Sequence, residues 1–335
     1  MVRLAFGLAA CLALLAGWSA DVEPTPGGLL LVANKGDHAL GIIDPVAGRQ
    51  VATVLESGIT GHEVAASADG RLAFVPIYGD SGVGRPGSDG RTIDVIDLVR
   101  RERVATLDLG RPERPHCPQL GPDGRLYVTT ELTSDIAVID PLRHEVVERI
   151  PTGQKESHML VLSPDGRSAF VSNVGAGTVS VVDVRARRVA VVLPVAPVAQ
   201  RIALSPDGRW AFTADQKQPR LIVIDAALRK VARSVALPAV GYGTAPTPDG
   251  RWLLAALPGA AAVAVVDLRS WAVSRTLEVP RAPQAVLVRP DGAVAYVSCD
   301  ASGTVAEIDL AHWTVSRLIT AGRMADGLAW AKAPR

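Results

Sequence analysis

The sequence predicts an all-β protein, a seven-bladed β-propeller with four-stranded blades in which the C-terminal strand closes the first blade. The first observation behind this prediction is a motif of two apolar residues followed by aspartate, which occurs seven times. Successive aspartates of this series are 53, 43, 43, 42, 42 and 42 residues apart. Repeats of this length with four strands are typical of propeller blades. The series comprises Asp44, Asp97, Asp140, Asp183, Asp225, Asp267 and Asp309.

The second observation is a turn signal, Pro-Asp-Gly or a close variant, that recurs between these aspartates. Proline presets φ for such a turn, aspartate can bond its own backbone, and glycine supplies a positive φ. The last five copies are spaced by 42 residues each time. The turn aspartates are Asp69, Asp123, Asp165, Asp207, Asp249 and Asp291.

Each repeat contains four short apolar runs separated by turn residues. In one repeat the predicted strands are residues 158–162, 168–173, 178–183 and 189–193. These runs are rich in Val, Ile, Ala and Leu, and no long helical period competes with them. Four antiparallel strands per repeat are therefore expected.

The two ends of the chain are predicted to share blade 1. The first repeat begins near Leu29 and lacks an innermost strand, whereas the C-terminal segment from Asp326 to Trp330 matches that strand. Asp326 lies 42 residues after Gln284, its counterpart in the preceding blade. We expect residues 28–335 to form one closed ring without open sheet edges.

The first 20 residues are predicted to be a secretory signal peptide, and residues 21–27 an N-terminal linker. Arg3 provides a positive start, residues 4–16 are apolar and uncharged, and small residues follow. This segment is too short and wrongly flanked for a membrane span. The protein is therefore expected to be periplasmic or secreted.

Composition argues against several other classes. Lys and Arg total 35 against 34 Asp and Glu, aromatic residues are 4%, and no basic stripe appears, so no nucleic-acid partner is expected. Cys117 and Cys299 fall in non-adjacent blades and should remain unpaired. No Cys-x-x-Cys-His motif for covalent haem is present. A monomer is expected.

Several segments resemble the YVTN-repeat propellers, the YncE-like and surface-layer-associated group. The resemblance is carried by residues 162–166 (Leu-Ser-Pro-Asp-Gly), 170–173 (Phe-Val-Ser-Asn) and 178–183 (Thr-Val-Ser-Val-Val-Asp). It covers roughly residues 28–330. It implies the propeller fold, but the wider superfamily includes lactonase-like enzymes, haem domains, quinoprotein subunits and binding scaffolds, so it does not select a function.

One position in the repeat carries a polar residue in every blade. It lies seven residues before each turn aspartate, where the innermost strand opens at the mouth of the central channel. In blades 2, 3 and 4 it is histidine, so half of the six histidines of the chain occupy one register. The seven residues are His62, His116, His158, Gln200, Tyr242, Gln284 and Asp326.

The three histidines predict a divalent metal site, with Zn, Cu or Fe as the ion. Three imidazole ligands with one open position are the pattern of a catalytic metal centre. Such a centre could be hydrolytic and, in the broad sense, lactonase-like. Glu131, in a loop on the same face, is a candidate fourth ligand or general base. Glu63 is a weaker catalytic candidate, because strand alternation should turn it to the opposite side from His62.

The other four residues of the register, together with a loop insertion in blade 2, are candidate substrate contacts. About ten extra residues fall within residues 78–91, on the face that carries the histidines. This segment is expected to be a lid or specificity loop, with Tyr78, Asp80 and Arg85 as its contacts. A loop extension without function is the alternative.

Two alternatives to the metal site remain open. The polar register could form a metal-free binding or catalytic site, or it could only hydrate the channel. The protein as a whole could be a non-catalytic scaffold that binds an extracytoplasmic protein instead of a small molecule.

Overall fold

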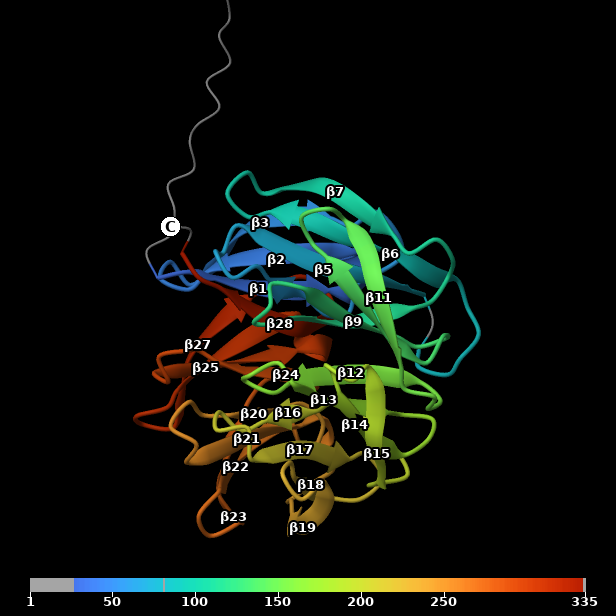
Figure 1. The fold of residues 1–335 in the computed structure, drawn as a ribbon. Helices are drawn as coiled ribbons and strands as arrows, with labels where there is room; N and C mark the ends of the chain where they lie inside the picture. The colour runs from blue at the N-terminus through green and yellow to red at the C-terminus, as the bar shows by residue number, and fades with distance from the viewer. Residues whose placement is uncertain (1–26, 81, 334–335) are drawn as a thin grey trace, which may run out of the picture.

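The computed structural model describes residues 27–80 and 82–333. The predicted signal peptide and nearly all of the predicted linker lie outside these residues. Seven four-stranded antiparallel sheets surround a common axis, and the prediction of a seven-bladed propeller is confirmed (Figure 1). No helix in the described ranges is long and apolar enough to cross a membrane.

The innermost strands contact one another in an unbroken ring. In blade order they are β28 (Ala325–Ala331), β4 (Ala65–Ala66), β8 (Pro115–Leu120), β12 (Ser157–Leu162), β16 (Ala203–Leu204), β20 (Thr244–Pro246) and β24 (Pro283–Val288). The second strands are β1 (Leu29–Asn34), β5 (Leu72–Gly79), β9 (Leu126–Thr130), β13 (Ser168–Asn173), β17 (Trp210–Asp215), β21 (Trp252–Leu257) and β25 (Val294–Cys299).

Two further strands complete each blade toward the rim. The third strands are β2 (Ala39–Asp44), β6 (Asp89–Asp97), β10 (Asp135–Asp140), β14 (Thr178–Asp183), β18 (Arg220–Asp225), β22 (Ala262–Asp267) and β26 (Thr304–Asp309). The outermost strands are β3 (Arg49–Leu55), β7 (Glu102–Asp108), β11 (Glu145–Pro151), β15 (Arg188–Pro194), β19 (Lys230–Ala236), β23 (Ala272–Glu278) and β27 (Thr314–Thr320). Three short 3₁₀ turns follow second strands: η1 (Lys35–Asp37), η2 (Pro258–Ala260) and η3 (Asp300–Ser302).

Blade 1 contains the first and the last strand of the described residues, as the sequence predicts. Strand β28 pairs antiparallel with β1, from Leu29 opposite Ala331 to Asn34 opposite Ala325. Figure 1 shows the red C-terminal strand beside the blue N-terminal one. The pairing gives β1 a partner on both sides and closes the ring.

The two aspartate series are turn residues, as predicted. In blade 4 the Asp165 carboxylate accepts hydrogen bonds from the Ser163 hydroxyl at 2.6 Å and the Arg167 N–H at 3.0 Å. Gly166 follows with φ of 68°, a conformation that favours glycine. The second series acts alike, since the Asp183 carboxylate accepts the Ala186 N–H at 2.8 Å. Both series therefore hold the turns on the face opposite the histidines.

The core lies between the blades and is built from the same register of the second strands. Large side chains five residues after the turn aspartate are almost fully buried there. They are Phe74, Phe170, Phe212, Leu254 and Tyr296. Cys117 and Cys299 are also buried, and neither is in a disulfide, as expected.

The innermost strands depart from regular pairing at the position that carries the polar register. The register of pairing shifts between Pro115 and Pro118, between Ser157 and Met159, and between Pro283 and Val286. In blades 2 and 5 the ladder begins later, and only an isolated bridge precedes it. A bulge leaves its residue unpaired and re-aims its side chain. The register residues therefore do not follow simple strand alternation.

Candidate functional site

A small polar cavity lies at the mouth of the central channel. Its volume is about 170 Å³. Six of the seven register residues line it, together with Met159 and Arg201, which directly follow His158 and Gln200. Lys35, from η1, and Gly82 and Val83, from the insertion of blade 2, complete the wall. We call this space the histidine cavity. The register residues that line it are His62, His116, His158, Gln200, Tyr242 and Asp326. Gln284 of blade 7 is not among them.

The structure therefore places six of the seven register residues around one space. Gln284 is half-buried and does not line the histidine cavity.

The three imidazoles lie against one another and against Tyr78. The rings of His116 and His158 have centroids 3.6 Å apart with an interplanar angle of 31°. His62 meets His116 edge-on at 5.3 Å, and the Tyr78 ring lies 4.7 Å from His62. Neither His62 nor His116 makes a side-chain hydrogen bond to any other described residue. The Nδ1 atoms of His116 and His158 are buried and have no hydrogen-bond partner in the described ranges.

Burial keeps these imidazoles neutral. It lowers the pKa of His62 to about 3, and it lowers the pKa of His116 well below the usual value, with the neighbouring histidines adding to the effect. Burial also lowers the pKa of His158, although Glu131 opposes this shift. Neutral imidazoles can each donate one hydrogen bond and offer one lone pair to a ligand.

Acid should therefore destabilise the protein through His62. An unfolded histidine binds a proton below about pH 6.5 but folded His62 does so only near pH 3, so the free energy of unfolding falls as pH drops below 6.5. Between pH 8 and pH 5 this group accounts for about 2 kcal/mol. The free energy of unfolding is measured by urea at pH 8 and at pH 5 for the wild type and for His62→Gln. The decrease from pH 8 to pH 5 should be smaller in His62→Gln than in the wild type, by about 2 kcal/mol. His312→Gln, at an exposed site, is the control and should lose as much as the wild type. An equal loss in His62→Gln and wild type would contradict the prediction.

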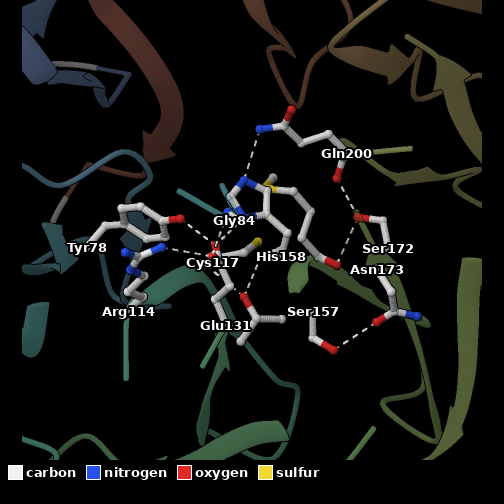
Figure 2. A network of polar contacts seen from close by, with 12 residues as sticks. Tyr78, Gly84, Arg114, Cys117, Glu131, Ser157, His158, Ser172, Asn173 and Gln200 are labelled. Carbon is white, nitrogen blue, oxygen red and sulfur yellow. Dashed lines mark hydrogen bonds and ion pairs between the residues drawn. The ribbon is translucent and has the colours of Figure 1, made fainter. Parts of the chain in front are cut away.

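A buried network holds His158 from behind (Figure 2). The Tyr78 hydroxyl donates a hydrogen bond to Glu131 Oε2, and the Gly84 N–H donates to Oε1 at 3.1 Å. Arg114 Nη1 lies 3.2 Å from the same Oε1. The Nδ1 atom of His158 is 3.6 Å from Glu131 Oε2, which is an ion-pair distance but too long for a hydrogen bond.

Glu131 is ionised in this network. Burial alone would raise its pKa, but His158 and Tyr78, and then the Gly84 N–H, outweigh burial and hold the pKa at about 2. A carboxylate beside Nδ1 favours the tautomer with the proton on that atom. The other nitrogen, Nε2, then accepts from the Gln200 amide at 3.0 Å. Glu131 is thus placed to orient His158, and it does not line the histidine cavity.

The insertion of blade 2 lies over the histidine sector. Gly82 and Val83 line the histidine cavity, and Arg114 holds the loop by donating to the Arg85 carbonyl at 2.6 Å and to Asp89 at 2.5 Å. The side chains expected to touch a substrate are placed differently. Asp80 is exposed and accepts the Ser88 N–H, and Arg85 lines a neighbouring cavity of about 440 Å³. Tyr78 is fully buried behind the loop.

The opposite wall of the histidine cavity is charged. Arg201 of blade 5 donates to Asp326 of blade 1 at 2.5 Å, and its Nη2 also lies 2.7 Å from Glu63 Oε1 of blade 2. Because these blades are not neighbours, Arg201 spans the channel. Lys35 Nζ lies 2.9 Å from Asp326, and the Tyr242 ring lies 5.1 Å from the Arg201 guanidinium.

The expectation that strand alternation turns Glu63 away from the channel is wrong. Its carboxylate is buried against Arg201, which reaches it from across the channel, and the innermost strand of blade 2 is irregular at this point. Burial, with Asp326 adding to it, raises the pKa of Glu63 to about 7 despite the opposing effect of Arg201. Glu63 can therefore exchange a proton near neutral pH. It does not line the histidine cavity itself but contacts Arg201, which does.

The side chains as placed do not surround a metal position. Within residues 27–80 and 82–333, no three His, Cys, Asp or Glu side chains are arranged so that they could hold one ion. The histidines are close together, but their nitrogens do not converge on one point in this arrangement.

Comparisons with known proteins bear on the fold alone. No family model matches the chain, and no curated protein matches it. A chain of hydrazine synthase from Kuenenia stuttgartiensis is similar in structure, with a TM-score of 0.71 and 19% identity over 89% of this chain and 99% of that one. A functionally unknown protein from Desulfotomaculum acetoxidans has a TM-score of 0.75 and 12% identity over 91% and 99% of the two chains. Both likenesses support the seven-bladed propeller.

Sequence reasoning did not find Arg201 or Lys35. Arg201 directly follows a register residue, as Glu63 follows His62, so reading two consecutive positions around the ring could have found both. Lys35 belongs to a second register, the position at which the regular pairing of the second strand with the third ends or is interrupted. That position also holds Tyr78, Glu131 and Asp300. A second alignment of the blades would have joined these four residues.

Proposed function

We propose that this protein is a small-molecule-binding β-propeller whose ligand site is the histidine cavity. The observation that carries the proposal is a set of neutral imidazoles around one small cavity, in which the buried Nδ1 atom of His116 has no hydrogen-bond partner among the described residues. A buried polar atom without a partner costs about 1–3 kcal/mol. A ligand that completes these hydrogen bonds accounts for such an arrangement.

Binding should be visible at the histidines themselves. A panel of small neutral, cationic and anionic molecules is titrated into the full chain, and the imidazole signals are followed by NMR. A ligand of the cavity shifts the signals of His62, His116 and His158 and leaves that of exposed His312 in place. If no member of the panel shifts the three cavity signals, the proposal fails.

A divalent metal ion, with Zn, Cu or Fe as candidates, forms a finer part of the proposal. The donor chemistry fits, because neutral imidazoles are good ligands for these ions and the buried Nδ1 atom of His116 has no hydrogen-bond partner among the described residues. His62, His116 and His158 would hold the ion, and their rings would have to turn to do so. A metal there would polarise the carbonyl of a substrate, and the reaction we propose is hydrolysis of the lactonase type.

The residues around the imidazoles have separate roles in this proposal. Glu131 fixes the orientation of His158, as carboxylates commonly do behind a ligand histidine. Glu63, with a pKa near 7, can hold or release a proton beside Arg201. Gln200 and Tyr242 present an amide and a phenol to the ligand. Gly82 and Val83 contribute to the wall beside the ligand.

Metal analysis tests the finer proposal directly. The wild-type protein, purified from its native compartment, is expected to contain close to one equivalent of a divalent metal, and His116→Ala should contain little. Lactone turnover should disappear in the same variant. His312→Gln serves as the matched control and keeps both properties. Equal metal content in wild type and His116→Ala would contradict the metal proposal, but it would not contradict the binding of a small molecule in the cavity.

Membership of the YVTN-repeat group and location outside the cytoplasm are also parts of the proposal. The Leu-Ser-Pro-Asp-Gly turn of residues 162–166 and the seven regular repeats support the first. The apolar, uncharged run of residues 4–16 after Arg3 supports the second.

A scaffold role is the second candidate, and the opposite face of the ring favours it. Arg and Trp side chains stack there at the edges of neighbouring blades, with Arg233 4.3 Å from the Trp271 ring and Arg275 5.1 Å from the Trp313 ring. A cavity of about 450 Å³ lies beside Trp252 and Trp313. Arg and Trp are enriched in protein interfaces. A protein partner of this face would not depend on the histidines.

A further inference from the structure

The donors in the wall of the histidine cavity outnumber its acceptors. We propose, on the premise that this cavity is the ligand site, that its ligand is a small oxyanion of the carboxylate or phosphate class. The inference rests on the charges in the wall, on donors that have no partner, and on the size of the space.

The wall holds two permanent cations and one carboxylate. Lys35 and Arg201 both contact Asp326, so a single anion is shared between two positive groups. Behind the wall, Asp300 lies 3.4 Å from Lys35 and Glu63 lies 2.7 Å from Arg201. Among the residues that line the cavity itself, two are cationic and one is anionic, and this lining favours an anionic ligand.

Several donors of the wall are not used by the protein. Arg201 contacts both of its carboxylates through Nη2, and its Nε is buried with no hydrogen-bond partner among the described residues. His116 has no side-chain hydrogen bond in the same ranges, and its neutral ring carries one N–H. The acceptor oxygens of Asp326 are already engaged by the two cations. A ligand rich in acceptor oxygens would satisfy these free donors.

The size of the cavity limits the ligand. Its volume of about 170 Å³ is on the order of five or six water molecules. A carboxylate on a short chain or a tetrahedral phosphate fits this space, whereas a nucleotide does not. Arg201 spans the channel, and Gly82 and Val83 form part of the cavity wall. An ion held among these buried groups is partly shielded from water, and charge-assisted hydrogen bonds are stronger in such surroundings.

Titration of the full chain with matched salts tests the proposal. Sodium acetate, sodium phosphate and neutral acetamide are added at constant ionic strength in the presence of EDTA, and the imidazole NMR signals are followed. Acetate or phosphate should give saturable shifts at the cavity histidines. Lys35→Met should weaken the affinity about tenfold, since one charge-assisted contact is lost. Lys230→Met, on an exposed outer strand, is the matched control and should bind as the wild type does.

The outcomes separate this proposal from the one it rests on. Saturation by acetate alone or by phosphate alone supports the oxyanion and identifies its source. If acetamide shifts the signals as strongly as acetate, the oxyanion proposal is overturned while small-molecule binding stands. Equal weakening in Lys35→Met and Lys230→Met would mean nonspecific screening and would also overturn it. No response to either anion overturns it, and the wider panel then decides the proposed function.

Discussion

A chain that ends at Met324 should not form a stable propeller. It lacks β28, so blade 1 keeps three strands and β1 loses the partner that pairs with it from Leu29 to Asn34. β28 also contacts β24 and β4 on either side, so its loss interrupts the ring of innermost strands. We expect the truncation to remove most of the ~5–15 kcal/mol that stabilises a typical domain. Circular dichroism during urea unfolding, with size-exclusion chromatography, measures the effect.

The control for this truncation is removal of residues 334 and 335, which leaves β28 intact. This shorter deletion should unfold at the same urea concentration as the full chain. A cooperative transition near the full-length midpoint in the chain ending at Met324 would show that the closure of blade 1 is not essential. The result we expect is aggregation of the truncated chain, because the edge of β1 is left without a partner.

The fold could be predicted from the sequence because its determinants are local and repeated. The turn at Asp165 and Gly166 is specified by four consecutive residues, and the same pattern or a close variant of it recurs in blades 2, 3, 5, 6 and 7. The closing strand could also be found, because the segment from Asp326 keeps the spacing of the repeat. Neither step requires knowledge of how distant side chains meet.

The site could be predicted only in part, because its contacts cross the channel. The register brought His62, His116 and His158 together correctly, since neighbouring blades place the same position side by side. It did not predict Arg201, whose long side chain reaches Asp326, 125 residues away in the chain. The failure at Glu63 has the same origin: pairing irregularities depend on the adjacent strand and are not visible in the spacing of one strand alone.

Arg201 is the residue on which the charged wall depends, and Arg201→Met should destabilise the protein strongly. The guanidinium is almost completely buried and contacts Glu63 and Asp326 together. Without it, Asp326 keeps Lys35, but Glu63 becomes a buried carboxylate with no cation in contact. Removing one partner of a buried ion pair costs about 3–5 kcal/mol. Urea unfolding at pH 8 measures the loss, and a loss below about 1 kcal/mol would contradict the buried ion pair.

The pH dependence of that loss distinguishes an orphaned charge from lost packing. In Arg201→Met the pKa of Glu63 should rise further above its usual value, because burial already raises it and the opposing cation is gone. The folded variant then binds a proton at a pH where the unfolded chain does not, so its free energy of unfolding rises as pH falls from 8 toward 5.5. The penalty relative to wild type should therefore shrink on acidification. The double variant Arg201→Met/Glu63→Gln should show a smaller penalty at pH 8 and little change with pH. A penalty that stays constant with pH in the single variant would indicate that packing of the long side chain, and not its charge, holds this wall together.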